Sequence, residues 1–131
     1  MTPDDDNALR LLDQAVLARL REELEADDGV WTVFVQTFIA LLPNRTERLR
    51  LTLTTGDLAG AMDAVLSLKT SSQMVGAERL ASLALDLERS LRHDTLHAEP
   101  SRVLPRLAAS HLGEIINCGQ QTIYLLQKYL G

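Results

Sequence analysis

The chain has 131 residues, of which 46% are hydrophobic and 24% are charged, and its formal net charge is -5 at pH 7. This size predicts one domain, residues 1–131, with a core of its own, and no apolar run approaches the roughly 20 residues that cross a bilayer. The 13 Lys and Arg are scattered, which argues against nucleic acid as a partner because phosphate binding needs a clustered basic surface.

The chain starts with acidic residues and continues into a predicted helix. Its first ten residues, MTPDDDNALR, lack the basic start and apolar core of a secretory signal, so we expect a cytoplasmic protein. Apolar residues then recur at helical spacing over residues 9–24, with glutamates on the opposite side. This pattern predicts a first amphipathic helix.

A second apolar pattern starts at Val30 and continues through Phe34, Phe38 and Leu41 to about residue 53. Pro43 lies within it. Because proline has no N–H to donate and its ring clashes with the preceding turn, we expect Pro43 to kink or break this helix.

The segment TTGDL predicts the end of one helix and the start of the next. Gly56 can adopt the left-handed conformation that ends a helix, and Asp57 can cap the following one. The third helix is then predicted over about residues 58–75, and Gly76 interrupts the pattern.

The last two predicted helices are separated by the loop HDTLHAEP. The fourth has the clearest apolar stripe of the chain: Leu80, Leu83, Ala84, Leu87 and Leu91. Ser101 is predicted to cap the fifth, with Pro105 in its first turn, and that helix continues to about Leu130. Five amphipathic helices with short connections predict an all-α, antiparallel up-down four-helix bundle with an additional N-terminal helix.

The segment LSLKTSSQMVGAERLASLALDLE, which follows Val65, resembles the core motif of histidine phosphotransfer (HPt) domains, roughly H-x-L-K-G-S-S-x-x-x-G-A-x-x-L-A-x-L-C-x-x-L-E. The matching positions are Leu68, Lys69, Ser71, Ser72, Gly76, Ala77, Leu80, Ala81, Leu83, Leu87 and Glu88. Upstream, LDQAVLARL, FIALLPNR and LRLTLTTGDL are similar to segments of the same family. The resemblance implies a four-helix bundle with an extra N-terminal helix.

Two departures fall where the family's chemistry takes place. Leu66 stands at the position of the phosphorylated histidine, and Thr70 stands at that of the glycine four residues later. Phosphoryl relay needs a neutral imidazole nitrogen as the nucleophile, and leucine has no lone pair to offer. The glycine leaves space for the partner, which Thr70 partly fills. The resemblance therefore implies a degenerate member with no catalytic residue, which is not an enzyme.

A helical projection places Leu66 roughly 130° from the centre of the apolar stripe that contains Val65 and Leu68, so we expect Leu66 to be substantially exposed. The residues predicted to share its side of the helix and to form a partner-binding surface are Met62, Leu66, Lys69, Thr70 and Gln73. Lys69 resembles the family lysine beside the phosphohistidine. Here it is expected either to pair with a receiver's acidic pocket or to be solvated.

Other reactive side chains carry weaker signals. His93, His97 and His111 lack the L-K-G sequence that follows the family histidine, and their spacing does not predict a metal site or a cofactor. Cys118, the only cysteine, excludes an internal disulfide and is expected to fill space in the core. Ser71 and Ser72 are expected to bond to the helix backbone or to pack in a seam of small residues.

The hypothesis is a pseudo-HPt module of a bacterial-type two-component phosphorelay. Its expected partner is the receiver domain of a response regulator or a hybrid histidine kinase, with no nucleic acid and no membrane. Two alternatives stay open. One is phosphorelay through an unrecognised histidine, and the other is a structural or dimerisation bundle, for which the apolar end TIYLLQKYLG could serve. The expected oligomeric state is a monomer or a weak homodimer.

Overall fold

The computed structural model describes residues 10–24 and 29–131, and this part of the chain contains helices and their connections without a strand. The helices are α2 (Gln14–Leu24), α3 (Val30–Thr54), α4 (Leu58–Met74), α5 (Glu78–Asp94) and α6 (Pro100–Leu130). None of these described helices is both long enough and apolar enough to cross a membrane.

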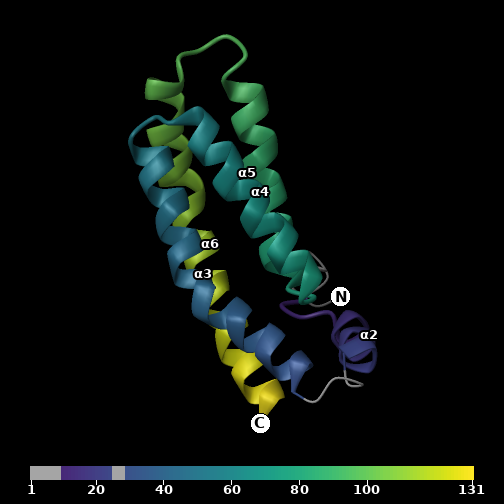
Figure 1. Cartoon of the computed structure of the whole chain (residues 1–131). Coiled ribbons are helices and arrows are strands. Elements are labelled where there is room, and N and C mark those ends of the chain that lie inside the picture. Colours follow the sequence, from purple (N-terminus) through teal and green to yellow (C-terminus); the bar gives the residue numbers. More distant parts are fainter. Residues whose placement is uncertain (1–9, 25–28) are drawn as a thin grey trace, which may run out of the picture.

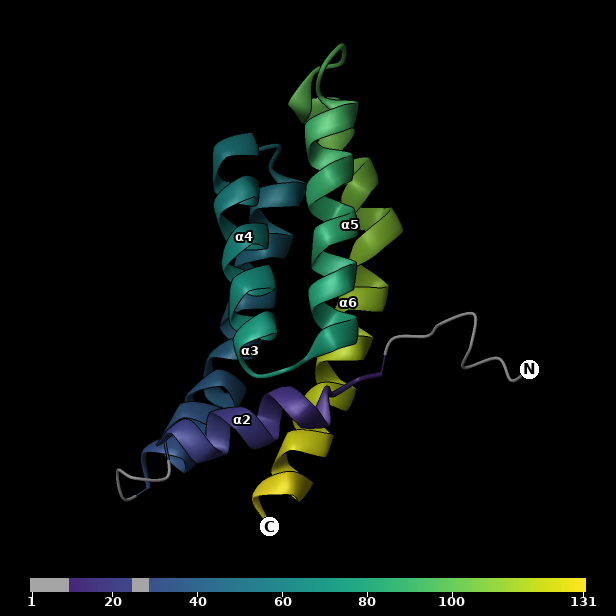
Figure 2. The same ribbon diagram turned by 90° about the vertical axis from the view of Figure 1, so that its right-hand side faces the viewer.

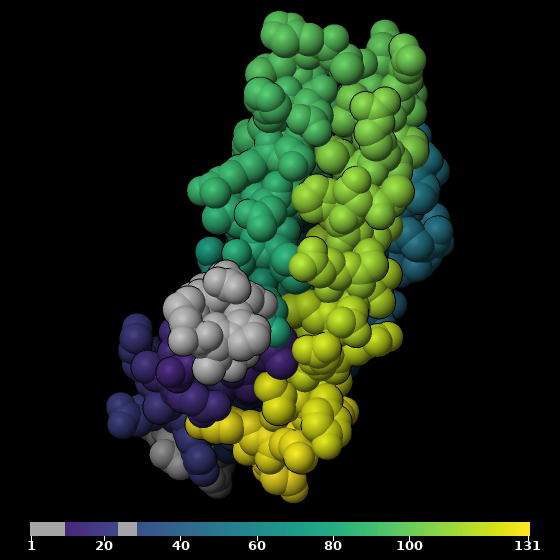
Figure 3. Space-filling view, turned by 180° about the vertical axis from the view of Figure 1, so that it is seen from behind, coloured from purple at the N-terminus to yellow at the C-terminus, as the bar shows by residue number. Residues whose placement is uncertain are grey.

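Four helices run antiparallel to their chain neighbours and form a closed ring, in which α3 packs on α4, α4 on α5, α5 on α6 and α6 on α3 (Figure 1). Figure 3 shows the face made by α5 and α6 from behind. The helices α3 and α6 extend beyond the others at one end, and α2 lies across the bundle there (Figure 2). The predicted all-α four-helix bundle with an extra N-terminal helix is confirmed.

The hydrophobic core lies along the bundle axis and receives side chains from each of the five described helices. The largest fully buried side chains are Leu17, Val35, Leu42, Leu49, Leu53, Leu68, Leu80, Leu87, Leu91, Leu104, Ile115 and Leu126. Within the predicted stripe of α5, only Leu83 is half-buried rather than buried. In α3, Phe38 is buried, but Val30 and Leu41 are exposed, so the apolar pattern of that helix is wider than the core it covers.

The first described helix begins at Gln14, which is later than the predicted start at residue 9; Leu9 itself lies outside the described residues. Asp13 causes the later start. Its Oδ1 accepts hydrogen bonds from the N–H groups of Ala15 (2.9 Å) and Val16 (3.3 Å), which is the geometry of a helix cap.

The segment before α2 is tied to the turn between α4 and α5. The Asp13 N–H donates to the Gly76 carbonyl at 2.6 Å, and the Arg79 N–H donates to the Arg10 carbonyl at 3.1 Å. Gly76 has a φ of +74°, and a Cβ added there would lie 3.0 Å from the Asp13 carbonyl oxygen. Glycine is thus required both by the backbone conformation and by the close approach of the N-terminal segment.

Contacts of α2 and α6 with Trp31 close the end of the bundle. The Arg21 guanidinium carbon lies 5.1 Å from the centre of the Trp31 ring, and the Tyr129 ring meets Trp31 edge-on with centroids 5.7 Å apart. Leu126, one turn before Tyr129, is fully buried, and Tyr129 itself packs against the core. Much of the apolar end of α6 is therefore covered within the chain itself.

Proline has a milder effect on α3 than a break. The helix continues through Pro43 to Thr54, and its ribbon changes direction partway along its length (Figure 1). The backbone hydrogen bonds of the turns before and after Pro43 hold the helix together, although Pro43 itself has no N–H to donate. Of the two predicted alternatives, a kink or a break, the helix therefore shows the kink, as a bend without an interruption.

The turns on both sides of α4 follow the prediction, whereas the start of α6 does not. Gly56 has a φ of +74°, and Asp57 Oδ1 accepts the N–H of Gly60 at 2.9 Å. The last helix starts at Pro100, so the predicted cap at Ser101 is wrong and Pro105 lies beyond the first turn. Pro100 at the first helical position has its φ already set for a helix, which favours the earlier start.

We expect Gly76→Ala to lower the free energy of unfolding by about 1 to 2 kcal/mol, because a left-handed non-glycine residue costs that much and the new methyl group also crowds Asp13. Urea denaturation followed by circular dichroism measures this. Gly113→Ala is the matched control: its Cβ meets nothing within 4 Å, and Ala within a helix should stabilise the chain by up to about 1 kcal/mol. Equal stability of the two variants would contradict the role assigned to Gly76.

Candidate functional site

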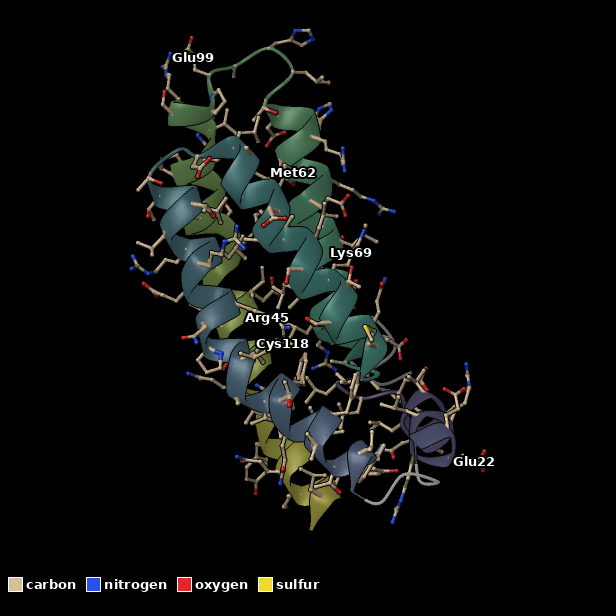
Figure 4. The ribbon with its side chains drawn as sticks, in the orientation of Figure 1. Glu22, Arg45, Met62, Lys69, Glu99 and Cys118 are labelled. Atoms are coloured by element: carbon tan, nitrogen blue, oxygen red, sulfur yellow. The ribbon has the colours of Figure 1, made fainter. Side chains whose placement is uncertain are left out.

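The predicted partner-binding residues all lie on one outward side of α4. The helix passes through Leu66 without interruption, and its opposite stripe is buried at Ala61, Ala64, Val65, Leu68 and Ser72. On the outward side, Thr70 and Gln73 are exposed, and Met62, Leu66 and Lys69 are half-buried. We call these five residues the Leu66 surface. Figure 4 labels Met62 and Lys69 along α4.

Leu66 is half-buried and packs against the core, so the prediction of a substantially exposed side chain was wrong. The projection considered only the direction of the side chain. A helical leucine lies back over the preceding turn, where Met62 is its neighbour, and α3 and α5 cover both flanks of α4. Val65 and Leu68 are fully buried, as predicted.

Lys69 forms an ion pair within the chain. Its Nζ lies 2.7 Å from Oε1 of Glu88 on α5, and the side chains of Lys69 and Glu88 are only 21% and 11% exposed. Arg92, one turn further along α5, donates to Oε2 of the same carboxylate through Nε at 3.2 Å and Nη2 at 3.1 Å. Lys69 is therefore not simply solvated, which corrects one of the two expectations, and its pairing with a receiver stays a prediction.

The carboxylate of Glu88 is held in its charged form. The hydrogen bond from Lys69 lowers the pKa of Glu88, burial opposes this, and Arg92 lowers the pKa further. Sequence reasoning noted Glu88 only as a motif match. A signal was present, however, because Glu88 stands next to Leu87 on the buried side of α5, and a carboxylate in such a place needs a partner.

The two motif serines have different surroundings. Ser71 Oγ donates to the carbonyl of Ser67 at 2.8 Å, which is the local bond that we expected. Ser72 is fully buried, and its hydroxyl has no hydrogen-bond partner among the described residues. Its small size suits the seam that it shares with Ala61 and Ala64 on the buried stripe of α4.

The histidines lie on other elements than the Leu66 surface. His93 is exposed near the end of α5, His97 is exposed in the loop that follows, and His111 is half-buried on α6. The described residues contain no group of three or more His, Cys, Asp and Glu that could hold a metal ion. Cys118 is buried, as expected, and burial raises the pKa of its thiol.

Comparison with known proteins gives a consistent result. The family model described as Hpt domain matches residues 33–118. The crystal structure of histidine-containing phosphotransfer protein B (HptB) from Pseudomonas aeruginosa PAO1 superposes with a TM-score of 0.74 at 26% sequence identity, covering 92% of this chain and 94% of that one. No curated protein sequence gives a match.

We expect Glu88→Gln to lower the free energy of unfolding at pH 7 by about 1 to 2 kcal/mol, because the variant loses its charge-assisted bonds to Lys69 and Arg92. The pKa of Glu88 is lower in the folded than in the unfolded state. Its stabilisation is therefore complete above the unfolded pKa of about 4.3 and disappears as the pH falls through the folded value.

Urea titrations of wild type and variant from pH 7 to pH 3 test this, and the difference in stability should shrink below about pH 4. Glu47→Gln is the control. Glu47 pairs with Arg50 on the open surface of α3, where solvent screens the charges, so little change is expected. A difference for Glu88→Gln that is independent of pH would count against the ion pair as the cause.

Proposed function

The chain belongs to the Hpt domain family, and from this premise we propose that it works in a phosphorelay as a pseudo-HPt module, which binds a response-regulator receiver or a hybrid histidine kinase without carrying phosphate. The family model covers α4 and α5 completely, together with most of α3. As a signalling module it would act through binding, so no catalytic residue is assigned.

The observation that carries the proposal is Leu66 on an otherwise intact α4. In the resemblance to HPt domains, this position belongs to the histidine whose ring nitrogen attacks a phospho-aspartate and holds the phosphoryl group as a phosphoramidate. The leucine side chain has only saturated carbon, so no such bond can form. Apart from Thr70, the motif positions around it on α4 are kept, with Leu68 buried and Lys69 fixed by Glu88.

The charges around Leu66 support binding of an acidic partner surface. Lys69, Glu88 and Arg92 form one cluster with a net charge of +1, counted from two cations and one carboxylate. Lys69 is turned toward Glu88, whereas the Arg92 side chain is 61% exposed. Arg92 is therefore the cation that a receiver's acidic pocket would meet first, whereas for Lys69 the sequence left open whether it pairs with a receiver or is solvated.

We expect the wild-type chain to gain no acid-labile, alkali-stable label when it is incubated with a phosphorylated receiver or an active kinase, because no imidazole stands at position 66. A histidine-bearing Hpt domain run in parallel shows that the donor is active. Label that disappears when His93, His97 or His111 is replaced would support the alternative of an unrecognised phosphohistidine.

Restoring the family's residues at positions 66 and 70 should restore phosphoryl transfer in two steps. Leu66→His supplies the nucleophile, but Thr70 still occupies the next turn, and attack requires about 3 to 3.5 Å between nitrogen and phosphorus, so weak transfer is expected. Adding Thr70→Gly should increase the rate, at a cost of less than about 1 kcal/mol in stability. Transfer is measured at a fixed receiver concentration.

Comparison of the wild type with the double variant separates receiver binding from phosphoryl transfer. Binding of the receiver by wild type, measured by calorimetry, combined with transfer by the double variant, is the result that the proposal requires. If neither form binds any receiver from the same genome, the bundle has a structural role, and light scattering would then show whether it forms dimers.

A further inference from the structure

The outward side of α6 is uncharged over its central part, and α6 forms much of the surface seen in Figure 3. Residues 115–127 contain no charged side chain, although 24% of the residues in the chain are charged. The exposed residues of this segment are Ile116, Asn117, Gln120, Gln121, Tyr124 and Gln127. A helix surface that meets only water usually carries charges, whereas the centres of protein interfaces are depleted of them. This part of α6 therefore has the composition of an interface.

Five exposed residues on α6 recur at alternating spacings of three and four residues: Glu114, Asn117, Gln121, Tyr124 and Lys128. This is the spacing at which a helix of a coiled coil meets a second helix. Because positions seven residues apart lie within roughly 20° of each other around a helix, the five side chains form one line along the surface of α6. We call these five residues the Tyr124 face.

A hollow of about 340 Å³ lies at the middle of the Tyr124 face. Its walls are Leu11, from the segment that precedes α2, and the α6 residues Asn117, Gln120, Gln121, Tyr124 and Leu125. The Tyr124 side chain is 58% exposed, and the Nζ of Lys128 lies 5.0 Å from the centre of its ring. Exposed aromatic rings of this kind are common anchors of protein interfaces. The hollow and the ring together provide a shape into which a similar ring can fit.

The two charged residues of the Tyr124 face have opposite signs and lie at its two ends. Glu114 and Lys128 are exposed, and neither forms an ion pair with another described residue. Glu114 precedes Gln121 by seven residues, and Lys128 follows it by seven. A second copy of α6, antiparallel to the first and related to it by a two-fold axis at Gln121, would therefore place each Glu114 beside Lys128 of the other copy. The face is thus complementary in charge to itself.

The Tyr124 face and the Leu66 surface lie on opposite helices of the bundle. Both α6 and α4 pack on α3 and α5, so that these two helices stand diagonally across from each other. The outward sides of α6 and α4 therefore point in different directions. A protein that covers the Tyr124 face leaves the Leu66 surface free.

We propose that the Tyr124 face binds the same face of a second copy of this chain, with the two α6 helices antiparallel around a two-fold axis at Gln121. Each Tyr124 ring enters the hollow of the other copy, and a Glu114–Lys128 pair closes each end. The face is roughly 21 Å long, so the interface belongs to the small class that buries less than about 1,200 Å² and forms weakly. This dimer does not depend on the pseudo-HPt function.

Sedimentation velocity of the full chain over a wide range of concentrations tests the dimer. The average mass should rise with concentration toward twice the mass of the chain. Tyr124→Ala, at an exposed position, should weaken the dimer at least about fivefold, as expected for an aromatic anchor. Ile116→Ala is the matched control, because Ile116 is an exposed apolar residue of the same helix outside the Tyr124 face, and it should leave the dimer unchanged.

A charge exchange tests the antiparallel arrangement. Glu114→Lys places two lysines together at each end of the interface and should weaken the dimer at least about tenfold. The double variant Glu114→Lys, Lys128→Glu restores opposite charges at both ends and should dimerise as the wild type does. Recovery in the double variant requires that position 114 of one copy meets position 128 of the other.

Cross-linking tests the position of the axis. Gln121→Cys should form a disulfide with its own copy when oxidised glutathione is added, because residue 121 lies at the axis. Ser110→Cys, also exposed on α6, should not, because residue 110 would lie roughly 33 Å from its copy along the helix. A monomer at every concentration, an unchanged dimer in Tyr124→Ala, no recovery in the double variant, or equal cross-linking of the two cysteine variants would each overturn the proposal.

Discussion

Burial of one stripe of α4 is the constraint on which the rest of the structure depends. Ala61, Ala64, Val65, Leu68 and Ser72 are all buried, and α3 and α5 pack on the two flanks of the helix. Small side chains in this stripe allow close packing, and close packing leaves α4 a single rotation about its axis. Every other residue of α4 then has a fixed direction. Leu66, Lys69 and Met74 take their places as a consequence.

This constraint explains how the fold accommodates a leucine at position 66. The residues that hold α4 in place face inward, while position 66 faces outward, so the identity of the residue at that position does not open the core. Leucine even adds some packing, because it is half-buried against the core. The fold alone would therefore not reveal which residue stands at position 66.

Two cations on opposite sides of α4 illustrate how packing decides the role of a charge. Lys69 lies between α4 and α5, where Glu88 meets it, and the pair joins those two helices. Arg45 lies between α3 and α4, where the described residues offer it no carboxylate. The ion pair between Lys69 and Glu88 is satisfied within the chain and contributes to its stability, whereas Arg45 has no ion pair among the described residues.

The pattern of residues was enough to predict the five helices of the described residues, the turns at Gly56 and Gly76, and the position of Leu66 on α4, because periodicity and backbone preferences are local properties. The starts of two helices were misplaced: the cap at Asp13 overrides the apolar pattern before α2, and Pro100 suits the first helical position better than the predicted cap at Ser101 allows. Only the tertiary structure decided that Leu66 is half-buried, that Lys69 pairs with Glu88, 19 residues away, and that Arg45 stands unpaired in a groove. These features depend on which helices become neighbours, and contacts between distant segments leave no periodic trace in a single sequence.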